Sequence, residues 1–258
     1  MTLTYIVLAT FLGGLLSVVI AASLTVTVLS KVVRSLVSLS AGVLLGTALI
    51  HLLPEAFESS AGAHELFLTL LAGLMFFFLL EKAELYRHGH HHEGDGDHHH
   101  HGFDHEQAGR GGWTVLVGDS IHNFCDGVII ASAFLVDARL GVVTALAIIA
   151  HEIPQEVGDY IVLLNAGFTR AKALLFNALS GLAAVLGGVV GYFVVRPWED
   201  LFPYLLVVAS SSFIYVAVAD LIPQLQRRLS WRETAAQLLW LAGGLGLILV
   251  LVDQFHSH

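Results

Sequence analysis

The chain has little charge and almost no cysteine. Only 13% of its 258 residues are Asp, Glu, Lys or Arg, whereas an ordinary soluble domain carries about 25%. The mean hydropathy is +0.76, so a single water-exposed globular domain is excluded. The lone cysteine, Cys125, excludes an internal disulfide framework. The first segment, MTLTYIVLATFLGG, has no basic stretch, and we expect a membrane span here instead of a cleaved signal peptide.

Long apolar runs occupy most of the chain. A helix needs about 20 apolar residues to cross a hydrocarbon core of roughly 30 Å. Eight runs meet this requirement, at residues 3–29, 36–57, 64–86, 114–136, 141–163, 173–195, 202–224 and 234–253. The strands of a membrane barrel would be short and alternating, and these runs are neither. We therefore predict an all-α fold, with one transmembrane domain of eight helices over residues 1–258.

Basic residues are distributed unevenly between the two ends of these spans. If the N-terminus is outside, ten of the twelve Lys and Arg residues fall on the cytoplasmic side, and only Arg139 and Arg196 fall outside. Cytoplasmic loops of membrane proteins carry the excess of Lys and Arg. The sequence thus predicts that both termini are outside, in the plasma membrane or an inner membrane of the cell.

A low-complexity segment lies between the third and fourth spans, at residues 88–112. Histidine alternates there with Gly and acidic residues, which predicts a disordered cytoplasmic loop. Imidazole and carboxylate both bind divalent transition metals, so the loop is a candidate for metal collection, and a solvated linker is the alternative. The candidate histidines are His90, His91, His92, His98, His99, His100 and His101.

Two spans carry polar residues on one helical face. The fourth span has Asp119, His122, Asn123 and Asp126 at i, i+3, i+4 and i+7. The fifth span has, also at helical spacing, His151, Glu152, Gln155, Glu156 and Asp159. An acid at the centre of a membrane helix costs about 2.5–3.5 kcal/mol. These side chains must therefore face each other, a cavity or an ion.

Depth in the bilayer brings the two polar faces to one level. The helices are antiparallel and rise 1.5 Å per residue, so six residues fall within about 5 Å of the midplane: His122, Asn123, Asp126, His151, Glu152 and Gln155. Imidazole, carboxylate and amide groups suit a transition-metal site, and we predict one here; a purely structural polar core is the alternative. Pro154 cannot donate to the carbonyl of Ala150, so the fifth span is expected to kink beside this site.

Other polar residues extend from this level toward both surfaces. We expect a cation pathway that includes, on the cytoplasmic side, Asp119, Glu156 and Asp159 and, on the outer side, His51 and Glu55. Some of these residues have a second interpretation. Asp119 and Asp220 are equally compatible with helix packing or gating, and Glu55 with a place at the membrane interface.

Two motifs in these spans resemble those of a known transporter family. HNFCDG, residues 122–127, is similar to the HNxxDG pattern in the fourth helix of the ZIP (Zrt/Irt-like) metal transporters, and HEIPQE, residues 151–156, to the HExPHE pattern in the fifth. The resemblance extends to LIHLLPEAF and FIYVAVADLIPQL. It implies eight spans with both termini outside, and import of Zn²⁺ and in many members Fe²⁺, Mn²⁺ or Cd²⁺. It also implies that His122, Asp126 and His151 are the main ligands, with Asn123, Glu152 and residue 155 at or beside the site.

Two features depart from the family pattern. Gln155 stands where some members have His and others have Glu, and a neutral amide is a weaker ligand than either. The sixth span offers Asn177 and Ser180 but no carboxylate, whereas some members contribute one from this span. A single metal site is therefore expected in preference to a two-metal centre.

We expect a transporter and not an enzyme, with the metal ion as cargo and no catalytic cofactor. The expected partners are divalent metal ions and the lipid bilayer, with no nucleic acid, and a second copy of the chain in a homodimer is a further candidate. The main alternative is an intramembrane zinc metallohydrolase, but its HExxH motif would need a second His where Gln155 stands. A cation-diffusion exporter has His and Asp at i, i+4, as His122 and Asp126 are here, but usually has six spans and a soluble C-terminal domain.

Overall fold

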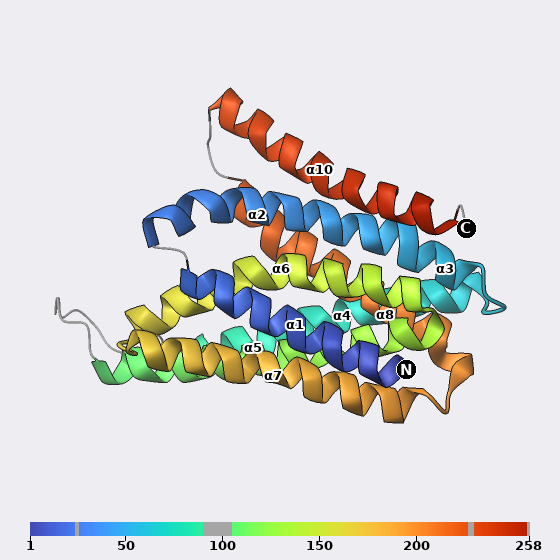
Figure 1. Cartoon of the computed structure of the whole chain (residues 1–258), viewed down its shortest axis with the longest axis horizontal. Helices are drawn as coiled ribbons and strands as arrows, with labels where there is room; N and C mark the ends of the chain where they lie inside the picture. Colours follow the sequence, from blue (N-terminus) through green and yellow to red (C-terminus); the bar gives the residue numbers. More distant parts are fainter. Residues whose placement is uncertain (24–25, 90–104, 227–229, 257–258) are drawn as a thin grey trace.

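The protein is a bundle of helices (Figure 1). The computed structural model describes residues 1–23, 26–89, 105–226 and 230–256, and these ranges contain no strand. The first half of the bundle comprises α1 (Thr2–Ser23), α2 (Val26–Gly46), η1 (Thr47–Leu52), α3 (Leu53–Phe57), α4 (Ala63–Gly89) and α5 (His105–Val136). The second half comprises α6 (Ala138–Asn165), α7 (Arg170–Val195), η2 (Glu199–Leu201), α8 (Phe202–Tyr215), η3 (Val216–Leu221), α9 (Ile222–Leu225) and α10 (Trp231–His256).

Eight stretches of these helices, counted over the described ranges, are long and apolar enough to cross a membrane. The second span is formed by α2, η1 and α3 in series, and the seventh by η2, α8, η3 and α9. The other six spans are each a single helix. The prediction of an all-α membrane protein with eight spans is confirmed.

The boundary between the first two spans differs from the prediction. We expected the first span to continue to residue 29, but α1 ends at Ser23 and α2 already begins at Val26. Lys31 and Arg34, which we expected in the connection, belong to α2. A helix tolerates such residues near the membrane surface, because the long side chains of Lys and Arg can reach water from an apolar stem.

Helices enter the expected His-rich loop from both ends. α4 continues to Gly89 and α5 begins at His105, so residues 105–112 are helical. Glu106, Gln107 and Ala108 are good helix formers, which explains the early start of α5. The seven histidines expected to collect metal lie outside the described residues, and that role stays a prediction.

The helices pack as two groups that meet at α2 and α6. α1, α5, α6 and α7 pack against one another, while α10 packs on α2 and α4 packs on α8. α2 joins the groups through its contact with α6. Both chain termini lie at the end of the bundle where α3 connects to α4 (Figure 1). The location of both termini outside the cell stays a prediction.

Glycines bring the backbones of α5 and α7 into direct contact. A Cβ added at Gly127 would lie 2.0 Å from the carbonyl oxygen of Ala184, and one added at Gly187 would lie 2.0 Å from that of Phe124. Only a residue without a side chain fits at such an approach, as is common between membrane helices. This contact holds α5, which carries half of the predicted ligands, firmly against α7.

The second and seventh spans each contain a six-residue π segment. In η1 the N–H of Leu53 bonds to the carbonyl of Ala48, five residues earlier, and η3 ends with the equivalent bond. Each segment ends two residues before a proline, Pro54 in one span and Pro223 in the other. π segments inside longer helices are frequent at functional sites.

Candidate metal centre

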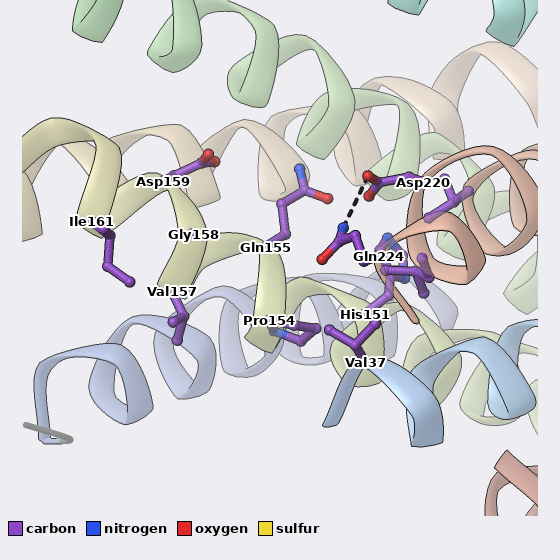
Figure 2. Close-up of a pocket in the computed structure, with 12 residues that line it drawn as sticks. Val37, His151, Pro154, Gln155, Val157, Gly158, Asp159, Ile161, Asp220 and Gln224 are labelled. Atoms are coloured by element: carbon purple, nitrogen blue, oxygen red, sulfur yellow. Dashed lines mark hydrogen bonds between the residues drawn. The ribbon is translucent and has the colours of Figure 1, made fainter. Parts of the chain in front are cut away.

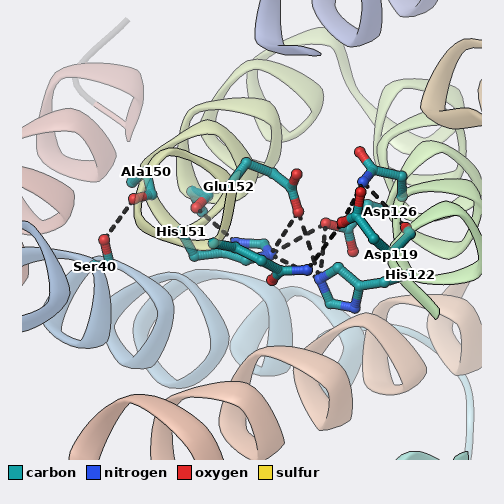
Figure 3. Close-up of polar contacts among 10 residues, drawn as sticks. Ser40, Asp119, His122, Asp126, Ala150, His151 and Glu152 are labelled. Carbon is teal, nitrogen blue, oxygen red and sulfur yellow. Dashed lines mark hydrogen bonds and ion pairs between the residues drawn. The ribbon is translucent and has the colours of Figure 1, made fainter. Parts of the chain in front are cut away.

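Four predicted ligands meet between α5 and α6. The side chains of His122, Asp126, His151 and Glu152 each offer one ligand atom, and these atoms all lie within 4.8 Å of one another. α5 presents His122 and Asp126 one helical turn apart, and α6 presents the adjacent pair His151 and Glu152. Figure 3 shows the two imidazole rings and the two carboxylates pointing toward a common centre.

The distances within this four-residue group are similar to one another. Nε2 of His122 lies 3.3 Å from Nε2 of His151, 3.5 Å from Oε1 of Glu152 and 3.7 Å from Oδ2 of Asp126. Nε2 of His151 lies 3.1 Å from the same Asp126 oxygen and 3.6 Å from the same Glu152 oxygen. Four ligands bound tetrahedrally to zinc at about 2.0–2.1 Å are about 3.4 Å apart. The group therefore has the dimensions of a zinc coordination shell.

A hydrogen bond orients the ring of His151. Its Nδ1 lies 3.3 Å from the carbonyl oxygen of Ala147, one turn earlier in α6. A carbonyl can only accept, so Nδ1 carries a hydrogen, and in the neutral imidazole Nε2 presents its lone pair to the other three ligands. Metal-binding histidines commonly have their second nitrogen fixed in this way.

The group is buried and rich in negative charge. Asp126, His151 and Glu152 are almost fully buried, and His122 retains 20% exposure of its side chain. Among the described residues, neither carboxylate oxygen of Glu152 has a hydrogen-bond donor. Burying carboxylates without compensation is costly. A divalent cation between the four side chains would supply the missing positive charge.

A second group of carboxylates adjoins the first. Asp119, Glu152 and Glu156 also have oxygens within 4.8 Å of one another, so Glu152 belongs to both groups. The amides of Asn123 and Gln155 donate to Oδ1 of Asp119 at 3.0 Å and 3.3 Å. The two amides that we predicted as metal ligands thus contact Asp119 in this structure, and we had placed Asp119 and Glu156 only on the pathway.

α7 adds neutral groups to this second cluster. Nδ2 of Asn177 donates to the backbone carbonyl of Glu156 at 2.9 Å, and Ser180 lies beside Asp119. Gly181 leaves space next to Glu156, since an added Cβ would lie 3.7 Å from Oε1 of that residue. The second group therefore has three carboxylates from α5 and α6 and no fourth from α7.

A cavity of about 330 Å³ reaches the four-residue group from one side (Figure 2). Its α6 wall runs from His151 and Gln155 to Asp159, and the role of Asp159 in a pathway stays a prediction. η3 and α9 form the opposite wall with Asp220 and Gln224, which are joined by a hydrogen bond of 3.0 Å.

The two pathway residues predicted on the outer side lie elsewhere. His51 is buried in η1 and Glu55 is half-buried in α3. Neither of them belongs to the two ligand groups or lines this cavity. Their role in a pathway stays a prediction.

One residue of α2 beside the metal centre was not predicted from the sequence. The hydroxyl of Ser40 donates to the carbonyl of Ala150, the same carbonyl that Pro154 leaves without a helical partner. The sequence indicated that Ala150 would need a donor, but it contained no signal that identified Ser40 among the many small residues of the second span.

The comparison with known families decides what kind of protein this is. Residues 81–252 match the family described as "ZIP Zinc transporter". The chain belongs to the ZIP zinc transporter family. The predicted resemblance to this family is thus confirmed. ZIP proteins are transporters and not enzymes, so the prediction that this chain is not an enzyme is confirmed and the metallohydrolase alternative is wrong.

Individual ZIP proteins match over different lengths. The zinc transporter ZIP13 of Pongo abelii is 32% identical over 240 residues, which cover 86% of this chain and 67% of ZIP13. The ZIP13 homolog of Drosophila melanogaster is 30% identical over 280 residues, covering 88% and 79% of the two chains. The human zinc transporter ZIP6 is 40% identical over 113 residues, but the match spans only 15% of ZIP6.

Proposed function

We propose that this protein imports divalent transition-metal ions, above all Zn²⁺, into the cytoplasm through the site formed by His122, Asp126, His151 and Glu152. Fe²⁺, Mn²⁺ and Cd²⁺ are further candidate substrates. Membership of the ZIP family and the relatives named as zinc transporters support this assignment. The metal is cargo and no catalytic cofactor is involved.

The observation that carries the proposal is the spacing of the four ligand atoms. The five distances that involve a histidine nitrogen lie between 3.1 Å and 3.7 Å, and they suit a tetrahedral ion with two nitrogen and two oxygen ligands. Zinc favours this geometry and this ligand set, whereas Mn²⁺ prefers more ligands and oxygen donors. The site is therefore expected to accept Zn²⁺ and Cd²⁺ more readily than Mn²⁺.

The one-sided cavity supports transport by alternating access. Under the orientation that the basic residues favour, Asp159 lies on the cytoplasmic side of His151, so the cavity is an exit toward the cytoplasm. On the outer side of His151, Leu52 and Ile148 are buried and belong to the same hydrophobic core. A carrier must open this outer side while closing the inner one. The second carboxylate group provides the next ligands for an ion that leaves His122 and His151.

Zinc flux into proteoliposomes tests this function. Purified protein should admit Zn²⁺ to a trapped fluorescent indicator, and His122→Ala should abolish this flux because one of four ligands is lost. A direct ligand should contribute more than a residue outside the coordination shell, whose loss costs roughly 10–100-fold in affinity. We therefore expect zinc binding by His122→Ala to weaken by at least about 100-fold.

His64→Ala is the matched control. This histidine lies near the start of α4, is exposed and belongs to neither ligand group, so its loss should leave the flux unchanged. Wild-type flux in the His122→Ala variant, at equal protein content, would remove this site from the transport mechanism.

A further inference from the structure

α6 has a proline at the point where it carries its metal ligands. Pro154 has no N–H, so the carbonyl of Ala150 lacks the bond that a regular helix would give it. In the second and seventh spans a π segment precedes the proline. α6 contains no such segment and continues as one α-helix from Ala138 to Asn165. The carbonyl of Ala150 must therefore be satisfied from outside α6.

Ser40 of α2 supplies the missing donor. Its hydroxyl lies within hydrogen-bonding distance of the carbonyl of Ala150 (Figure 3) and is 2.7 Å from the carbonyl of Leu36 in its own helix. A hydroxyl has a single hydrogen, so these two acceptors share it. If α2 and α6 separated, Ser40 would keep Leu36 as its partner, and Ala150 would lose the donor that Ser40 supplies.

The bond joins α2 to the turn of α6 that presents the metal ligands. Ala150 directly precedes His151, and Val37, one turn before Ser40, lines the cavity together with His151 and Pro154. The opposite face of α2 is held by α10, because a Cβ added at Gly42 would lie only 2.1 Å from the carbonyl of Leu241. α2 is thus a firm support, and Ser40 connects it to the ligand-bearing turn.

We propose that Ser40 is a positioning residue of the metal centre: by donating to the carbonyl that Pro154 leaves free, it holds the His151 turn of α6 against α2. This inference rests on the proposed transport function. Without the hydroxyl, α6 is free to bend differently at Pro154, and Nε2 of His151 leaves the place that a four-coordinate ion requires.

Zinc binding and zinc uptake by Ser40→Ala test the proposal. Leaving a buried carbonyl without a donor costs enough to weaken binding roughly tenfold, and the half-saturating zinc concentration should rise by the same factor. Ser40→Thr keeps the hydroxyl and should remain close to wild type. Ser210→Ala is the control, since this buried hydroxyl donates to the carbonyl of Leu206 in its own helix, at 2.9 Å; its half-saturating concentration should not change.

A second substitution distinguishes positioning from general stabilisation. Pro154→Ala restores an N–H at position 154, which can donate to Ala150 within the helix. Loss of the Ser40 hydroxyl should therefore have little effect on zinc affinity in this background. A double-mutant cycle of the two changes measures this coupling. Calorimetric titration of purified protein with Zn²⁺ gives the affinities even for a variant that binds the ion but does not complete transport.

The outcomes separate the two proposals. If wild type neither binds nor transports Zn²⁺, the proposed function fails. If wild type does both and Ser40→Ala has the same zinc affinity per folded protein, the positioning role is wrong. It is equally wrong if Ser40→Ala weakens binding by the same factor with Pro154 and with Ala at that position. If Pro154→Ala does not fold, a loss of affinity in Ser40→Ala that Ser40→Thr does not share supports the role, and an equal loss in both overturns it.

Discussion

Nε2 of His122 and Nε2 of His151 lie 3.3 Å apart, although 29 positions separate the two residues along the chain. In the neutral imidazole of His151, Nε2 directs a lone pair at this contact, because Nδ1 donates to Ala147. Two imidazole nitrogens this close need a proton or a metal ion between them, because two facing lone pairs repel each other. This contact makes the site sensitive to any competition between protons and metal.

Apparent zinc affinity should therefore depend on pH. A protonated imidazole cannot bind a metal. Zinc binding should therefore weaken as the pH falls, because protons compete with the ion for both histidine ligands. Zinc titrations between pH 5 and pH 8 measure the slope. A zinc affinity that does not change with pH in wild type would show that neither histidine binds the ion directly.

Glu152 should matter more than Glu156, because it belongs to both ligand groups. Glu152→Gln keeps the shape of the side chain and removes its charge, so zinc affinity should fall by roughly tenfold or more. Glu156→Gln changes only the second group and is the matched control. Calorimetry on both purified variants makes the comparison. An effect of Glu156→Gln equal to or larger than that of Glu152→Gln would contradict the assignment of Glu152 to the first group.

Residue 155 should tune metal preference. Gln155 lies one turn after His151 and donates to Asp119 at 3.3 Å. A histidine at this position would offer zinc a preferred ligand and would also release Asp119 from this bond. Gln155→His should raise the Zn²⁺ to Mn²⁺ uptake ratio and can lower the maximal rate if the ion leaves more slowly. Competition uptake at equal expression gives the ratio, and an unchanged ratio would place residue 155 outside the coordination shell.

Gly187→Ala should destabilise the contact between α5 and α7. The added methyl group would lie 2.0 Å from the carbonyl oxygen of Phe124, so the backbones must separate. Overpacking of this kind costs about 1–3 kcal/mol or more, and the apparent melting temperature in detergent should fall by several degrees. Gly243→Ala is the control, since nothing lies within 4 Å of a Cβ there. Equal melting temperatures would mean that this contact contributes little to stability.

Much of this protein was predictable from the helical spacing of its residues and from the free-energy cost of placing acids inside a membrane. Apolar runs of about 20 residues identified all eight spans, because a helix needs a run of this length to cross the hydrocarbon core. The helical spacing of His122 and Asp126, combined with the antiparallel run of the next span, was enough to place them beside His151 and Glu152. The structure brings these four side chains together as that argument expected.

Features that depend on contacts between distant helices were not predictable. The sequence does not specify that Glu152 lies close to both Asp119 and His122, because this depends on how α6 is rotated about its axis. The start of α2 at Val26 was missed, since Lys31 and Arg34 were expected to mark the connection. Ser40 was missed because any small polar residue of the neighbouring helices could have reached Ala150.

The two π segments relate the second span to the seventh. Spans two and seven stand at equivalent places from the two ends of the chain, run in opposite directions, and each carry a π segment two residues before a proline. His51 in one segment and Asp220 in the other occupy the same place relative to that proline. This correspondence is typical of an inverted internal repeat. The two halves thus carry the same departure from α-helical geometry in spans that run in opposite directions, as an inverted repeat requires.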